Sequence, residues 1–163
     1  MTNNSTNQPF RNCLNKLFEL LSRRDYSVKE LQQKLSKKAF DPETIEKAIR
    51  WADERRYIRP PEELSHSLAQ QLLQRGKGRR YIQQYLKKRG LPPIDEFDKD
   101  TELHKALEFA LQRAKRCATL DRAAREKIGR QLITRGFPLD IVRTVIYEKL
   151  RDYEELKSKS DVH

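Results

Sequence analysis

The amino-acid sequence predicts an all-α protein built from three tandem three-helix, helix-turn-helix-like repeats. Strong helix formers (Leu, Ala, Gln, Lys, Arg and Glu) dominate its 163 residues, whereas only 5 are Gly. Apolar residues make up 36% of the chain, which argues against one thick core and suits thin helical layers with one buried stripe each. The third observation is a sequence pattern that occurs three times along the chain.

Each occurrence of this pattern has two aliphatic residues four apart, then a basic, a small and an apolar residue, with a proline close by. The aliphatic pair shares one helix face, the basic residue complements the C-terminal helix dipole, and the small residue suits a left-handed cap. The occurrences are Leu31, Leu35, Lys38, Ala39, Phe40 and Pro42; Ile82, Leu86, Arg89, Gly90, Leu91 and Pro92; and Ile128, Leu132, Arg135, Gly136, Phe137 and Pro138.

Helix boundaries are marked most clearly in the first repeat. An apolar stripe predicts its first helix over residues 10–23. Ser27 and Glu30 have the spacing of a capping box at the start of the second helix. Asp41 followed by Pro42 supplies an N-cap and a preset first turn for the third helix.

The second and third repeats follow the same order with weaker signals. Apolar periodicity predicts their first helices over residues 61–74 and 101–117. The two prolines in Pro92 to Phe97 allow only a short or irregular third helix in the second repeat, and the acidic stretch 95–102 is the predicted linker. The expected parts are a disordered tail (1–9), three repeats (10–60, 61–99 and 100–157) and a second tail (158–163).

The charge of the chain predicts an anionic partner. Lys and Arg total 35 against 24 Asp and Glu, a formal net charge of +11, which raises the concentration of anions near the surface. Basic residues cluster in 74–90 and 113–135, at equivalent places in adjacent repeats, which predicts one continuous basic surface; ordinary solvated helix faces are the alternative. The candidate contacts with a protein or nucleic acid are Arg75, Lys77, Arg79, Arg80, Lys87, Lys88, Arg89, Arg113, Arg122, Arg125 and Arg130.

A loop with two glycines, Arg75-Gly76-Lys77-Gly78, precedes the most basic helix. Its backbone can approach an anion closely, and the helix N-terminus that follows favours negative charge. The loop lacks the spacing of a P-loop, so a solvated turn is the alternative interpretation.

Several classes of protein are disfavoured. The two cysteines, Cys13 and Cys117, are far apart and are predicted to be reduced thiols of a cytoplasmic protein. No apolar run approaches the ~20 residues that span a bilayer, so no membrane partner is expected. The three histidines lack metal-ligand spacing. We therefore expect no metal, no cofactor and no catalytic residues.

The residues also resemble a known family. The segment Arg24–Leu35 is similar to the first-repeat signature of the RecX regulatory proteins, and Ile49-Arg50-Trp51 with Tyr57-Ile58 resembles the next part of that family's pattern. The segment Arg75–Gly78 resembles its second-repeat motif, and Leu132–Pro138 resembles its third-repeat signature.

This resemblance implies three tandem repeats in an elongated, curved array that binds the RecA recombinase filament in its helical groove. It implies a regulator that inhibits RecA on single-stranded DNA, lowers homologous recombination and SOS activity, and in some members binds DNA directly; we expect this chain to act as a monomer. The alternative is a transcription or nucleoid factor that binds DNA alone, with Gln83 and Gln84 as candidate base-reading residues. A nuclease is the third possibility.

Overall fold

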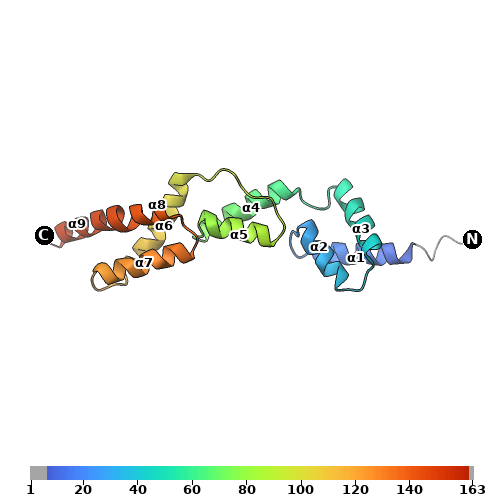
Figure 1. Ribbon diagram of the computed structural model, residues 1–163, viewed down its shortest axis with the longest axis horizontal. Coiled ribbons are helices and arrows are strands. Elements are labelled where there is room, and N and C mark those ends of the chain that lie inside the picture. Colours follow the sequence, from blue (N-terminus) through green and yellow to red (C-terminus); the bar gives the residue numbers. More distant parts are fainter. Residues whose placement is uncertain (1–6, 162–163) are drawn as a thin grey trace, which may run out of the picture. The chain divides into compact units, whose positions relative to one another are not determined.

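The computed structural model describes residues 7–161, and all regular structure in this range is helical, which confirms the predicted fold class (Figure 1). No helix in this range is long and apolar enough to cross a membrane. The helices are α1 Gln8–Leu21, α2 Val28–Ser36, α3 Pro42–Glu54, α4 Pro61–Gln74, α5 Arg79–Lys88, α6 Lys99–Ala114, α7 Arg122–Thr134, α8 Leu139–Arg143, the π-helix η1 Thr144–Lys149, and α9 Leu150–Ser160.

The chain divides into two compact units. The first contains the residues up to Ser67 together with Leu86–Pro93, and the second contains Leu68–Tyr85 together with the residues from Ile94 onward. Helices α4 and α5 therefore contribute residues to both units. This division follows packing, and the boundaries of the three sequence repeats remain a prediction.

The tails predicted from the sequence are partly helical. Helix α1 begins at Gln8 and includes Pro9, which a first helical turn tolerates. Helix α9 continues to Ser160. The expectation of disorder over 8–9 and 158–160 is therefore wrong. The remainder of the expected tails, residues 1–6 and 162–163, lies outside the described part of the chain.

The core of the first unit lies between α1, α2 and α3. Leu17, Leu31 and Leu35 are fully buried in it. The predicted capping box is present, with the Ser27 hydroxyl accepting from the Glu30 N–H (3.2 Å) and the Glu30 carboxylate accepting from the Ser27 N–H (2.9 Å). These local bonds set where α2 begins, as the sequence indicated.

Small residues end the second helix of each repeat in the left-handed conformation, as predicted. The φ angles are 62° at Ala39, 70° at Gly90 and 89° at Gly136. The Phe137 N–H then bonds to the Leu132 carbonyl (3.1 Å), which closes the last turn of α7.

The short third helix expected in the second repeat does not form, and residues 91–98 contain no helix. Pro92 and Pro93 lack the N–H groups that a helix requires. The buried Ile94 instead satisfies both its backbone groups with the side-chain amide of Gln83, which donates to the Ile94 carbonyl and accepts from the Ile94 N–H. An extended segment held by a side chain thus replaces the helix.

Helix α6 starts inside the stretch 95–102 that was predicted to be a linker. The Asp98 carboxylate accepts a hydrogen bond from the Thr101 N–H (3.3 Å) and so caps the helix at Lys99. This early start places Glu102 in the first turn of α6, where its side chain is fully buried.

The core of the second unit is formed by α6, α7 and the continuous run α8–η1–α9. Phe137, Leu132 and Leu150 are fully buried at its centre. The π-helical turn Thr144–Lys149 interrupts an otherwise α-helical run from residue 139 to residue 160. One helix with a widened turn therefore packs against both α6 and α7.

We expect the two cysteines to differ strongly in reactivity. Cys13 is fully buried, and burial, with the nearby Asp41 charge, raises the pKa of its thiol to about 11. Cys117 is partly exposed, and its Sγ donates to the Arg113 carbonyl (3.4 Å). In native protein at pH 8, Ellman's reagent should label Cys117 alone, with Cys13 reacting only on unfolding. Equal rates for both thiols would contradict the buried position of Cys13.

Candidate partner-binding surfaces

The loop Arg75–Gly78 packs against the chain itself. The Gly78 N–H donates to the Arg135 carbonyl (2.8 Å), and the Arg80 N–H donates to the Gly136 carbonyl (3.0 Å). A Cβ added at Gly78 would lie 2.4 Å from the Phe137 nitrogen. This glycine therefore permits close contact between two turns of the second unit, and its N–H group is already bonded within the chain.

The anion at the N-terminus of α5 is the chain's own Glu102. One carboxylate oxygen accepts from the Arg79 backbone N–H (2.8 Å), and the other accepts from the Arg79 Nε (2.8 Å). A buried carboxylate at this position satisfies the helix dipole and an otherwise unpaired N–H group. The Arg79 guanidinium, predicted to contact a partner, thus has an internal partner, although its side chain is 37% exposed.

The far end of α5 is held by Arg89, which is only 9% exposed. Its guanidinium donates to both Glu30 oxygens (2.9 and 3.1 Å) and to the Asp25 carbonyl (3.0 Å). The Ser27 hydroxyl bonds to the Arg89 carbonyl. These bonds join the end of α5 to the start of α2 within the first unit, so Arg89 has an internal role and is removed from the predicted contacts.

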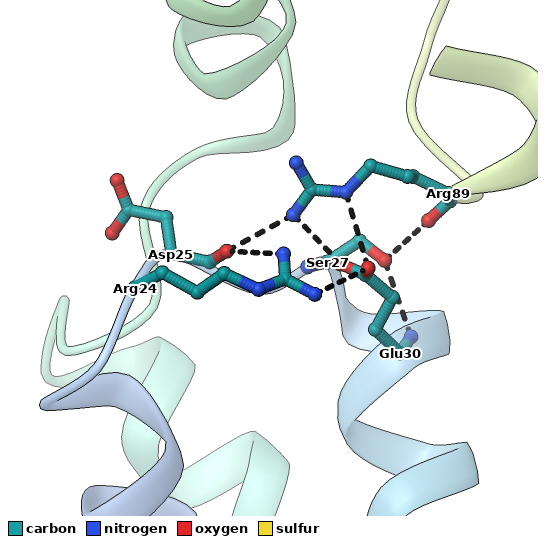
Figure 2. A network of polar contacts seen from close by, with 5 residues as sticks. All are labelled: Arg24, Asp25, Ser27, Glu30 and Arg89. Atoms are coloured by element: carbon teal, nitrogen blue, oxygen red, sulfur yellow. Dashed lines mark hydrogen bonds and ion pairs between the residues drawn. The ribbon is translucent and has the colours of Figure 1, made fainter. Parts of the chain in front are cut away.

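Glu30 is the centre of this network. Figure 2 shows the guanidinium groups of Arg24 and Arg89 converging on its carboxylate, while the Asp25 carboxylate points away. Burial on its own would raise the pKa of Glu30. The hydrogen bonds from Arg89, Ser27 and Arg24 outweigh burial and lower the pKa below its ordinary value.

Other basic residues of α5 are free of internal partners. Arg80, Lys87 and Lys88 are exposed, and no side-chain hydrogen bond or ion pair engages them among residues 7–161. Gln83 faces inward to bond Ile94, so only Gln84 of the two candidate base-reading residues remains exposed. The sequence could not separate these free cations from the paired Arg79, since all lie in one basic run.

Two basic residues beside the glycine loop contact neighbouring groups. The Lys77 ammonium lies 4.4 Å from the centre of the Tyr81 ring, a cation–π distance. Arg75 is exposed, and its carbonyl accepts a long bond from the Arg135 guanidinium (3.4 Å). Both side chains belong to the second unit.

The second basic cluster surrounds α7. Arg113 lies over the Phe109 ring (5.0 Å), and Arg125 pairs with Glu154. Arg122 pairs with Glu126 (2.8 Å) yet keeps 93% of its side chain exposed. Arg130 is exposed and has no internal side-chain partner in the described part of the chain.

Three of these arginines line a groove of about 630 Å³ between α7 and the α8–η1 run. Three exposed apolar residues there, Ile133, Leu139 and Tyr147, carry no sequence signal of their exposure, because apolar residues in helices are usually buried. The groove is lined by Leu120, Arg122, Arg125, Glu126, Gly129, Arg130, Ile133, Leu139, Val142, Arg143, Ile146 and Tyr147.

Compact helical units with exposed, unpaired cations define a basic helical-repeat protein. Comparison with known proteins identifies the group. The model of the RecX first three-helix domain matches residues 13–51. The chain is 30% identical over 153 residues to the regulatory protein RecX of Clostridioides difficile (strain 630), covering 86% of this chain and 69% of that one. For RecX of Actinobacillus pleuropneumoniae serotype 5b (strain L20), identity is 31% over 141 residues, covering 77% and 84%.

The chain therefore belongs to the RecX family of regulatory proteins, and the resemblance noted in the sequence is confirmed. Solved structures support the fold. The crystal structure of RecX from Lactobacillus salivarius matches with a TM-score of 0.77 at 22% identity, covering 86% of this chain and 96% of that one. A second crystal structure, of a regulatory protein RecX, has a TM-score of 0.76 at 17% identity, covering 86% and 74%.

Replacing Arg89 with Met should lower the free energy of unfolding by about 2–3 kcal/mol, because Glu30 then loses its most buried partner. Urea denaturation measures this, and Lys88→Met, at the exposed neighbouring position, is the control. A loss no larger than that of Lys88→Met would contradict the internal role of Arg89.

The same network should make stability depend on pH. The pKa of Glu30 is lowered in the folded state, so its contribution is present above the unfolded pKa of about 4.3 and is lost as pH falls through the folded pKa. Glu30→Gln should therefore be less stable than the parent near pH 7 and should lose less stability on acidification. Urea denaturation of both proteins near pH 7 and in acid measures the two losses, and an equal loss of unfolding free energy in the two proteins on acidification would refute this.

Alanine substitutions at Gly78 and Gly129 should have opposite effects on the stability of the fold. Gly78→Ala should cost about 2 kcal/mol or more, because its Cβ would lie 2.5 Å or less from backbone atoms. Gly129 lies within a helix, and a Cβ there meets Ile146 at an ordinary 3.6 Å, so Gly129→Ala should be neutral or stabilise by about 0.5 kcal/mol. Thermal unfolding of both variants checks the difference.

Proposed function

We propose that this chain regulates the RecA recombinase by binding the RecA–single-stranded DNA filament in its helical groove and inhibiting it. Strand exchange, ATP hydrolysis and the co-protease activity of the SOS response would then fall. The chain acts in the cytoplasm as a monomer, without a cofactor and without catalysing a reaction. Membership of the RecX family supports this proposal.

The observation that carries the proposal is the set of exposed cations on α5 and α7 that have no internal partner. Arg80, Lys87, Lys88 and Arg130 remain available to acidic protein surface, to DNA phosphates or to both. Arg79 and Arg89 are held by the carboxylates Glu102 and Glu30, which are themselves largely buried. The proposed contacts are the other candidates, of which Arg122 and Arg125 also have ion pairs within the chain: Arg75, Lys77, Arg80, Lys87, Lys88, Arg113, Arg122, Arg125 and Arg130. Their alignment into one continuous positive surface remains a prediction.

Filament binding explains inhibition through geometry. A ligand in the helical groove touches neighbouring recombinase subunits and opposes the movements that ATP turnover and strand exchange require. If the ligand also neutralises about six phosphates, its affinity falls steeply with salt, with a log–log slope near −4 for a single strand. Inhibition of RecA ATP hydrolysis on single-stranded DNA, titrated at two salt concentrations, measures both properties.

The alternative of a sequence-specific DNA-binding protein is weakened by the structure. The amide of Gln83, one of its two candidate base-reading groups, is bonded to Ile94. A footprint on specific duplex DNA in the absence of RecA would still favour that alternative over filament binding.

Charge reversal at the end of α5 should remove the inhibition. The double variant Lys87→Glu with Lys88→Glu should weaken inhibition of RecA ATP hydrolysis about tenfold, because like charges would then face the filament. The matched control is Lys157→Glu with Lys159→Glu, because both pairs lie in the last turn of a helix and share its dipole penalty. Circular dichroism should show unchanged helicity for both proteins.

The two variants change the net charge equally, so they separate location from overall charge. Equal loss of inhibition in both would mean that only net charge matters. Full inhibition by the α5 variant would eliminate this end of α5 as a contact with the filament.

A further inference from the structure

The groove between α7 and the α8–η1 run collects exposed apolar side chains. The described residues leave five large apolar side chains exposed, and three of them line this groove: Ile133 at 45%, Leu139 at 45% and Tyr147 at 67%. Exposed apolar residues scattered singly are ordinary, but their concentration in one hollow marks an interaction site. The buried Val142 and Ile146 also contribute to its lining.

The charged residues that line the groove indicate the charge of the ligand that it favours. Arginines at positions 122, 125, 130 and 143 line it against one carboxylate, Glu126. Glu126 is already paired with Arg122, and Arg125 is paired with Glu154. Arg130 and Arg143 are exposed and keep no side-chain partner among residues 7–161. The occupant must therefore supply negative charge.

The π-helical turn provides a separate indication of function. It spans Thr144–Lys149 and contains two residues of the groove, Ile146 and Tyr147. π-Helical turns are rare, and they occur frequently at functional sites. Here the turn combines a buried Ile146 with an exposed Tyr147, an aromatic residue of the type that anchors protein interfaces.

We propose that this groove binds an acidic amphipathic segment of a protein partner. Apolar side chains of the segment pack on Ile133, Leu139 and Tyr147, and its carboxylates pair with Arg130 and Arg143. A nucleic-acid backbone would satisfy the arginines but would leave the two aliphatic side chains uncovered, whereas a helix laid in a groove covers both. The inference rests on the proposed function in placing this segment on RecA.

The test uses the intact chain and fluorescein-labelled overlapping peptides that cover the RecA sequence. Fluorescence anisotropy should detect binding of peptides that carry both acidic and apolar residues. Arg130→Glu and Tyr147→Ala should each weaken that binding about tenfold. Leu156→Ala is the control, because Leu156 is equally exposed at 66% but does not line the groove. Thermal unfolding establishes that each variant is folded.

Three results would overturn the inference: no acidic peptide binds, binding survives both groove substitutions, or binding is lost equally in Leu156→Ala. A labelled single-stranded oligonucleotide is tested in parallel. If its binding depends on Arg130 and Tyr147, the groove is a nucleic-acid site and the inference is again wrong. Filament inhibition is a separate measurement, so acidic peptides that bind without any inhibition of RecA would refute the proposed function alone.

Discussion

A buried carboxylate is stable only where a cation and hydrogen-bond donors meet it, and an arginine at each end of helix α5 meets such a carboxylate. Glu102 holds the first turn of the helix in the second unit, and Glu30 holds the residue that follows its last turn in the first unit. Both carboxylates are removed from solvent to a large extent and are matched by several donors. Each carboxylate holds the part of α5 that belongs to its own unit.

The same pairing decides which positive charges remain for a partner. Arg79 and Arg89 form ion pairs within the chain. The other basic residues of α5, Arg80, Lys87 and Lys88, are exposed. The basic run therefore contains two sets of residues: those that stabilise the fold through ion pairs and those that are exposed to solvent. Only the exposed set is available to a partner, and it is smaller than the composition suggests.

Features governed by near neighbours were predictable from the sequence. The Ser27–Glu30 capping box and the Asp41 cap involve residues three apart, and the left-handed turn at Gly136 follows from glycine chemistry. The partners of Arg79 and Arg89 lie 23 and 59 residues away, so no local pattern indicates them. The apolar groove escaped prediction for a related reason, since periodicity shows which helix face is apolar but not which of its residues a neighbouring helix covers.

The contact between Gly78 and Gly136 restricts which residues these two turns can carry. A Cβ at Gly136 would lie 2.3 Å from the Tyr81 nitrogen, and one at Gly78 would lie 2.4 Å from the Phe137 nitrogen. Neither position can exchange glycine for a compensating pair of larger residues, because the obstacle on each side is backbone. A side chain at either position would force the two backbones apart, so the closeness of this junction depends on glycine at both of its positions.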